Sequence, residues 1–249
     1  PEVHKYMRRF REITDQYGDT TIVGEIWEDD LEKWTAYYGP EGDELQLPFN
    51  FRLMQLKEWS EGVVRKSVED LEAALPEFAW PNYVLGNHDR KRPASRVGSQ
   101  AQARVAQMLL LTLRGTPTLY QGDELGMEEA VIPRDQWVDP WGINLGITRD
   151  GCRTPMQWDD SRYAGFSAVA PWLPVQADSI WRNVADMAKD PRSFLTMVRR
   201  LIHLRRQSPA LHAGEYYALD TTPAGVYAYI RAHGSERVLV ALNFTGEAK

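Results

Sequence analysis

The chain has 249 residues, a formal net charge of -6, and 43% hydrophobic and 26% charged residues. This is the composition of a globular protein large enough for one barrel, or for a large domain with a small one. The acidic balance and the lack of a basic run argue against nucleic acid as a partner, and no apolar run reaches the length of a membrane span. The single cysteine, Cys152, excludes an intrachain disulfide and reads as a small packing residue.

The first predicted elements are a helix and a strand. Residues 3–17 place apolar side chains at helical spacing, namely Tyr6, Met7, Phe10 and Ile13. A Gly18-Asp19 turn then leads into a β-branched run over residues 20–25, which ends at Glu25. Helix, tight turn and strand in this order form the repeating unit of an α/β fold. The acidic segment after Trp27 favours a solvated helix start over a cation site, because its spacing matches no EF-hand loop.

Three more strands are predicted, with helices between them. Residues 45–51 form the second strand, and residues 63–75 an amphipathic helix. A buried run at residues 83–85 forms the third strand and ends in Asn87-His88-Asp89. The clearest helix spans residues 96–114, and residues 116–120 form the fourth strand. The inward face of that helix is predicted to carry Val97, Ala101, Val105, Met108, Leu109, Thr112 and Leu113.

The last third of the chain changes character. Residues 128–190 are irregular and rich in Trp, Pro, Gly and Asp, and a segment of that length inside a compact domain is usually functional. A helix over residues 193–206 follows. Three β runs, at residues 214–219, 226–230 and 238–244, then predict an antiparallel sheet. A second, small domain is therefore predicted to begin near residue 210.

Two of the predicted strands end in an acid, Glu25 and Asp89. An acid just after a strand is commonly a helix cap or a turn residue. Parallel strands of a β/α barrel, however, present catalytic side chains at their carboxyl ends. Two strands that end in this way suggest two carboxylates converging on one pocket.

Four motifs occur together in a fixed order. They are Gly24-Glu25-Ile26-Trp27, Asn87-His88-Asp89, Gly115-Thr116-Pro117-Thr118-Leu119-Tyr120-Gln121-Gly122-Asp123-Glu124, and Arg153-Thr154-Pro155-Met156-Gln157-Trp158. Together they closely resemble the second half of the α-amylase family of glycoside hydrolases, family 13, and within it the α-glucosidase and oligo-1,6-glucosidase group. The resemblance runs over the whole chain.

The resemblance implies an α/β fold: the second half, four β/α units, of a TIM (β/α)8 barrel followed by a small antiparallel β domain. Residues 1–209 would hold the half barrel with its long loop at 128–190, and residues 210–249 the start of the β domain. A closed barrel needs eight strands. The half barrel is therefore expected to need an N-terminal half, and to expose unpaired strand edges that favour association when it is alone.

The resemblance also assigns catalytic roles. Glu25 matches the acid/base, and its place beside Trp27 would favour the neutral carboxyl by desolvation. Asp89 matches the acid that grips sugar hydroxyls and stabilises the charged transition state. His88 matches a hydroxyl-binding histidine, since a neutral imidazole both donates and accepts. Retaining cleavage also needs a carboxylate nucleophile about 5 Å from the acid, and no segment matches the Gly-x-Arg-x-Asp motif that carries it.

Arg153 matches the arginine that clamps the non-reducing end of the terminal glucose, a task that suits a rigid guanidinium fork. A structural role remains open, in which Arg153 pairs with Asp150 or Asp159. Two further arginines, Arg92 and Arg96, either orient Asp89 or cap the next helix. Aromatic rings, such as those of Trp27 and Phe166, could stack on a sugar or simply pack.

The sequence thus predicts a retaining α-glucosidase that acts on short α-linked glucosides, with no cofactor and no metal, and with the isolated chain inactive because it lacks the nucleophile. One alternative is a transglycosylating relative that handles sucrose or trehalose. Another is a non-catalytic, heavy-chain-like subunit that works by protein–protein contact. We expect a cytoplasmic protein, with secretion decided by any segment upstream of Pro1. Linkage preference is not encoded in the motifs found here.

Overall fold

The computed structural model describes residues 2–249 and divides the chain into two compact units. The first unit takes the residues up to Val84 together with Thr112–Thr118 and Ser208–Lys249. The second unit takes Leu85–Leu111 and Leu119–Gln207. None of the helices in the described part is long and apolar enough to cross a membrane.

The first unit begins with α1 (Val3–Thr14), which a 3-10 turn, η1 (Asp15–Tyr17), extends to the predicted end. Its polar face attaches it to the unit, because the buried carboxylate of Glu44 accepts from His4 Nδ1 at 2.7 Å and Arg8 Nη1 at 2.6 Å. The apolar face predicted from the sequence carries Tyr6 and Phe10, which stay more than half exposed. In this unit α1 is therefore held by ion pairs rather than by its apolar stripe.

The four predicted strands are present and parallel. β1 (Val23–Gly24) pairs with β2 (Leu47–Pro48), and β3 (Asn82–Val84) pairs with β4 (Thr116–Thr118). A parallel bridge between Asn50 and Tyr83 connects the two pairs, so the strands follow one another in sequence order. The ladders are shorter than predicted. Pro48 and Pro117 lie within them and supply no N–H donor, which limits the pairing.

Short helices and one long helix complete this part of the first unit. α2 (Leu31–Thr35) begins where predicted, and Asp30 caps it by accepting from the amides of Glu32 and Lys33. α3 (Arg52–Gln55) precedes α4 (Glu61–Ala74), which buries its inner stripe completely. That stripe consists of Val64, Val68 and Leu71. A second apolar cluster joins Phe51, Met54 and Val84.

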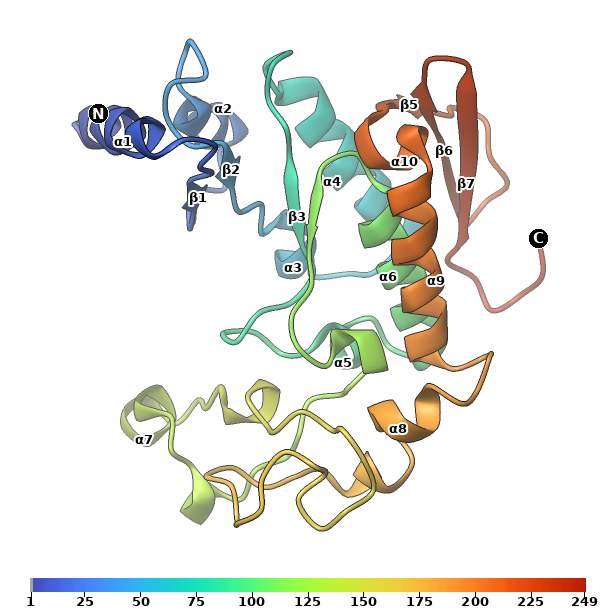
Figure 1. Cartoon of the computed structure of the whole chain (residues 1–249). Helices are drawn as coiled ribbons and strands as arrows, with labels where there is room; N and C mark the ends of the chain where they lie inside the picture. The colour runs from blue at the N-terminus through green and yellow to red at the C-terminus, as the bar shows by residue number, and fades with distance from the viewer. Residues whose placement is uncertain (1) are drawn as a thin grey trace. The chain divides into compact units, whose positions relative to one another are not determined.

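The antiparallel sheet predicted for the chain's end is present in the order β5-β6-β7. Its strands are β5 (Glu215–Ala218), β6 (Val226–His233) and β7 (Glu236–Asn243). α10 (Pro209–Ala213) packs on β6 and β7, and α4 packs on β6 (Figure 1). β6 is the central strand, hydrogen-bonded to both neighbours and buried at six of its eight positions.

A buried arginine ties this sheet to the rest of the first unit. Arg231 of β6 is fully buried and donates from Nη1 to the Thr112 carbonyl at 2.6 Å and from Nη2 to the Gly214 carbonyl at 2.8 Å. The Thr112 hydroxyl also lies 2.6 Å from the Tyr229 hydroxyl. Segments more than one hundred residues apart in sequence are thereby joined.

The second unit holds two longer helices. The predicted helix over residues 96–114 is divided into α5 (Pro93–Arg96) and α6 (Gln100–Thr112), because Gly98 adopts a left-handed φ of 89° between them. Ala101 therefore falls in the first turn of α6 and is exposed, so its predicted inward position is wrong. α9 (Phe194–Gln207) matches the predicted helix over residues 193–206.

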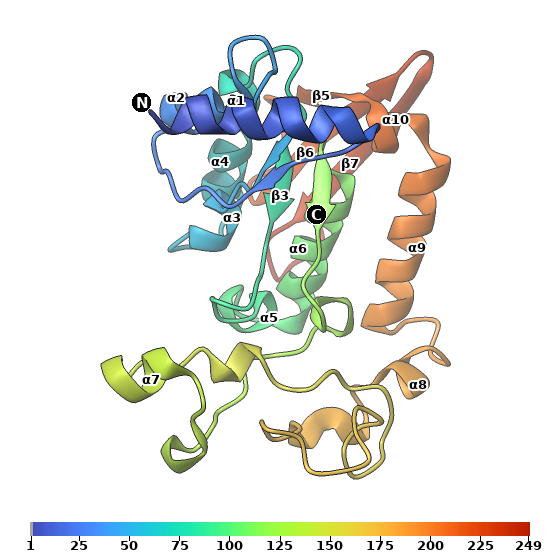
Figure 2. The same cartoon turned by 60° about the vertical axis from the view of Figure 1, so that its left-hand side comes forward.

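The rest of the second unit is irregular, as predicted for residues 128–190. It holds only short helices, of which α7 (Pro140–Leu145) and α8 (Val184–Met187) are visible in Figure 2. Four 3-10 turns lie between the longer elements, namely η3 (Asp123–Leu125), η4 (Arg134–Gln136), η5 (Asp150–Cys152) and η6 (Ala177–Ile180). The apolar cluster beneath them contains Leu125, Met127, Met156 and Leu195.

Candidate active site

The second unit brings three of the four predicted site residues together. The amide of Asp89 donates to the Asn87 side chain at 2.9 Å, which turns the chain sharply after the buried Leu85 and Gly86. Arg153 donates from Nε to the His88 carbonyl at 2.8 Å and from Nη2 to Asp89 Oδ1 at 3.0 Å. The alternative in which Arg153 pairs with Asp150 or Asp159 is therefore wrong.

A second arginine, Arg149, shares the same carboxylate oxygen, and the sequence reasoning missed it. Arg149 Nη1 donates to Asp89 Oδ1 at 2.8 Å. Its Nε and Nη2 grip both oxygens of the buried Asp139 at 2.8 and 2.7 Å. The hydrogen bonds from Arg149 hold the pKa of Asp139 well below its usual range. The guanidinium also lies over the ring of Trp141, 4.2 Å from its centroid.

The sequence carries only weak local signals for Arg149 and Asp139, and both residues lie outside the motif that begins at Arg153. Arg149-Asp150 stands just before the motif that contains Arg153, and Asp139-Pro140 has the form of a helix start. Asp139 does cap α7, accepting from the Trp141 amide. Nothing in the sequence states that this cap also holds an arginine that reaches across to Asp89.

The Asp89 cluster is open to solvent on one side. The Asp89 side chain is 23% exposed and the His88 side chain 59%. His88 Nε2 lies 3.6 Å from Asp89 Oδ1, the oxygen that both arginines contact. All of these contacts use Oδ1, so they leave Oδ2 available as an acceptor.

Glu25 lies in the first unit, directly after β1. Its side chain is exposed, and Oε1 accepts from Trp27 Nε1 at 2.9 Å. Trp27 also packs against Phe51, with ring centroids 4.3 Å apart. The indole meets the carboxylate with its N–H donor, and the expected desolvation of Glu25 stays a prediction. Phe166, the other predicted stacking ring, is 46% exposed in the second unit.

Arg92 and Arg96 bind backbone. Arg92 occupies the position before α5, as predicted for a capping residue, but its side chain makes no cap hydrogen bond and donates instead to the Gln121 carbonyl at 2.7 Å. Arg96 donates to the carbonyls of Lys91 and Leu85. Both therefore fasten the loop that carries Asp89.

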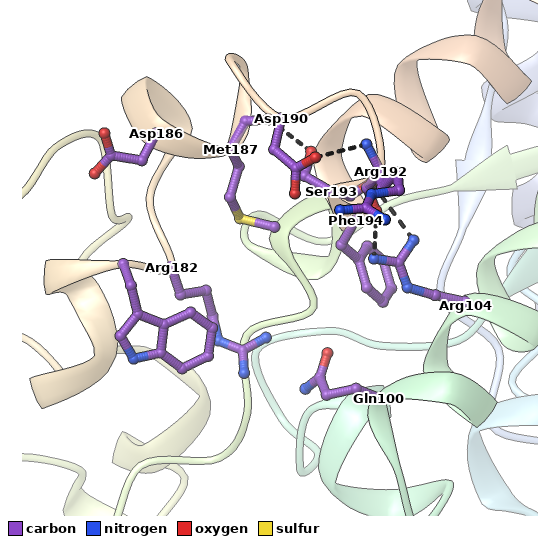
Figure 3. Close-up of a pocket in the computed structure, with 10 residues that line it drawn as sticks. Gln100, Arg104, Arg182, Asp186, Met187, Asp190, Arg192, Ser193 and Phe194 are labelled. Atoms are coloured by element: carbon purple, nitrogen blue, oxygen red, sulfur yellow. Dashed lines mark hydrogen bonds between the residues drawn. The ribbon is translucent and has the colours of Figure 1, made fainter.

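A separate pocket of about 330 Å³ lies elsewhere in the second unit (Figure 3). Phe194, Met187 and Arg182 point into it, and Arg104 and Gln100 line another side. None of the predicted site residues lines it. Residues 2–249 contain no group of three His, Cys, Asp or Glu side chains that could hold a metal ion. Cys152 is buried and burial raises its pKa to about 12, as suits a packing residue.

Comparison with known proteins accounts for the parallel strands β1 to β4 and for the cluster around Asp89. Residues 1–214 match the family model described as alpha amylase, catalytic domain. The chain belongs to the α-amylase family. It is 34% identical to the probable alpha-glucosidase of Rhizobium meliloti (strain 1021), covering 100% of this chain and 46% of that protein. It is 30% identical to the oligo-1,6-glucosidase of Bacillus cereus, covering 99% and 51%.

Solved structures of family members show the same fold. An alpha-glucosyl transfer enzyme superimposes with a TM-score of 0.90 at 35% identity, over 99% of this chain and 47% of that one. The trehalulose synthase from Pseudomonas mesoacidophila MX-45 gives a TM-score of 0.89 at 31% identity, over 99% and 51%. The parallel strands are four β/α units of a TIM barrel, and an antiparallel sheet follows them. The chain spans about half the length of the relatives it matches.

Proposed function

We propose that this α-amylase family chain is the acid/base-bearing part of a retaining α-glucosidase that removes terminal α-linked glucose from short oligosaccharides. The observation that carries the proposal is the Asp89 cluster: one carboxylate oxygen held by two guanidinium groups, beside an exposed imidazole. This arrangement fixes a negative charge in place while leaving acceptors and donors for sugar hydroxyls.

Each residue has a role that follows from its chemistry. Glu25 protonates the leaving oxygen and later activates water. Asp89 binds sugar hydroxyls through Oδ2 and stabilises the positive charge that develops on the sugar ring. His88 donates to a hydroxyl, and Arg153 recognises the terminal glucose. Because Arg153 also holds Asp89, it orients the carboxylate as well as contacting substrate.

The nucleophile is proposed to come from outside this chain. The motif expected to carry it is absent from the sequence, and the relatives that match are about twice as long. We therefore expect an upstream half barrel to supply the nucleophilic carboxylate, and the 249-residue chain to be inactive alone. Residues 1–209 would complete the barrel and residues 210–249 would begin the β domain.

Transfer to a sugar acceptor is the second candidate. The alpha-glucosyl transfer enzyme and the trehalulose synthase are structural neighbours, and the motifs present here do not separate transfer from hydrolysis. A heavy-chain-like subunit that acts through protein contacts is disfavoured, since such a role gives no reason to keep Glu25, His88, Asp89 and Arg153 together in one chain.

The test is hydrolysis of a nitrophenyl α-glucoside and of maltose by the chain joined to its upstream half barrel. Glu25→Gln is expected to lower kcat by about 10²–10⁴-fold on maltose. The loss is expected to be smaller on the nitrophenyl substrate, whose leaving group needs less protonation. Glu32→Gln, an exposed carboxylate of α2, is the matched control and should keep full activity.

A folded, joined protein that is silent on both substrates would contradict the glucosidase proposal and favour the subunit alternative. Product analysis in the presence of excess sucrose or glucose separates the two enzymatic candidates, because a transferase gives a new disaccharide where a hydrolase gives free glucose.

A further inference from the structure

Asp123, in the 3-10 turn η3 of the second unit, is a buried carboxyl that the proposed reaction does not use. It is 3% exposed, and neither of its side-chain oxygens has a hydrogen-bond partner within the described residues. Arg92 is equally buried. Its Nη1 donates to the Gln121 carbonyl, but its Nε and Nη2 have no acceptor in that part of the chain. Buried polar groups without hydrogen-bond partners cost free energy, so this arrangement calls for an explanation.

These two side chains lie at the two ends of the loop that carries Asp89, residues 86–92. At its start, a Cβ on Gly86 would lie 3.0 Å from Asp123 Oδ2 and 2.8 Å from the Pro93 ring, so the carboxyl packs directly against the loop backbone. At its end, the Arg92 amide donates to Glu129 Oε2 at 2.9 Å. A movement of either Asp123 or Arg92 is therefore transmitted to the loop.

The charges around Asp123 oppose one another. Arg92 and Arg96 favour its ionised form, whereas Glu124 on the same turn disfavours it. Burial is the strongest influence and raises the pKa of Asp123 to about 7. The proton on this carboxyl is thus exchanged within the neutral range.

We propose that Asp123 and Arg92 form a buried positioning pair that couples the Asn87-His88-Asp89 loop to pH. With Asp123 protonated, Arg92 binds the Gln121 carbonyl and the loop has the conformation described above. When Asp123 loses its proton, the carboxylate attracts the unused Nε and Nη2 donors of Arg92, and the guanidinium turns from Gln121 towards it. This turn of Arg92 changes the orientation of Asp89 on the loop. Its functional meaning rests on the proposed glucosidase function.

The experiment follows the loop directly by nuclear magnetic resonance of the 249-residue chain between pH 5 and 9. The reporters are the amide signals of Gly86 and Arg92 and the labelled side-chain carboxyl of Asp123. All measurements use a His88→Gln background, which removes the imidazole from the loop. The loop amides are expected to titrate with the Asp123 carboxyl, with a common midpoint near pH 7.

Asp123→Asn keeps the shape of the neutral carboxyl and is expected to abolish the titration of both amides. Asp160→Asn, an exposed carboxylate of the same unit, should leave it unchanged. Loop amides that stay constant from pH 5 to 9, or that titrate equally in Asp123→Asn, overturn the proposal. If that variant does not fold, the titration without it still decides between a moving and a constant loop. No substrate is involved, so this outcome is independent of glucosidase activity.

Discussion

At the scale of single residues, the Asp139 carboxylate depends on one partner more than on any other. It is buried and accepts from the Arg149 guanidinium, which also holds Asp89, as well as from the amides of Arg149 and Trp141. Arg149→Ala is expected to destabilise the chain by about 3 kcal/mol at pH 7, since a buried carboxylate loses its hydrogen-bonded counter-charge and is left with Arg153 Nη1 at 3.8 Å. Urea unfolding measures this. Arg90→Ala, at an exposed position of the Asp89 loop, is the control and should change stability little.

The ion pair between Asp139 and Arg149 also predicts that the free energy of unfolding depends on pH in the acid range. The pKa of Asp139 is lower in the folded chain than its ordinary value, so its stabilising contribution is present above that ordinary value and is lost as the pH falls towards the folded one. The free energy of unfolding of the natural chain should therefore fall more steeply between pH 4 and pH 2 than that of Arg149→Ala. Parallel pH profiles for the two proteins would contradict the assigned ion pair.

The sequence was sufficient to find Asp89 and His88 because they are adjacent in a short motif, and Arg153 because it opens another. It was insufficient for Arg149 and Asp139. Their significance comes from a contact that spans sixty residues of chain, and local patterns carry no information on such a contact. The desolvation expected for Glu25 stays a prediction: the sequence places Trp27 two residues away but leaves open which edge of the indole meets the carboxylate.

At the scale of elements, α4 is stabilised chiefly by its buried stripe. Leu71 is fully buried there, and Leu71→Ala is expected to lower the free energy of unfolding by about 2–5 kcal/mol through lost burial and the cavity left behind. Lys66→Ala, on the exposed face and paired with Asp70, should cost at most about 0.5 kcal/mol. Denaturant titrations of the two variants test whether the stripe or the ion pairs hold the helix.

Helices and strands differ in how well their limits could be predicted. Apolar spacing located α1, α4 and α9 to within a few residues, since helices this long show several turns of the pattern. The break between α5 and α6 required the backbone angle of Gly98, which a pattern of apolar residues does not reveal. The strands were found at the right places but too long, because hydrogen bonding rather than composition sets the limits of a ladder.

At the scale of the whole molecule, Arg231 joins parts of the first unit that are distant in the chain. Arg231→Met keeps the apolar stem but removes every donor, which leaves the Thr112 and Gly214 carbonyls without their charged partner. We expect a loss of about 3 kcal/mol and a fall in Tm of about 2–4 °C per kcal/mol for a chain of this size. Arg237→Met, on the exposed edge of β7, should melt close to the natural chain, and equal Tm values for both variants would refute the role of Arg231.

The overall architecture was predicted from the order of its elements, four strands with helices between them and then three β runs. Each β/α unit repeats the same local pattern, so the half barrel and the antiparallel sheet are visible without long-range information. The division into two compact units was not visible. The terminal sheet belongs with the first strands through contacts such as those of Arg231, and the boundary near residue 210 stays a prediction.

The central position of β6 also determines how this sheet exchanges hydrogen with water. Its amides are hydrogen-bonded to β5 on one side or β7 on the other, and most of its side chains are out of contact with solvent. Deuterium enters a β6 amide when the strand that accepts its hydrogen bond separates from β6. Hydrogen exchange at the β6 amides therefore reports how often β5 and β7 separate from the central strand of this sheet.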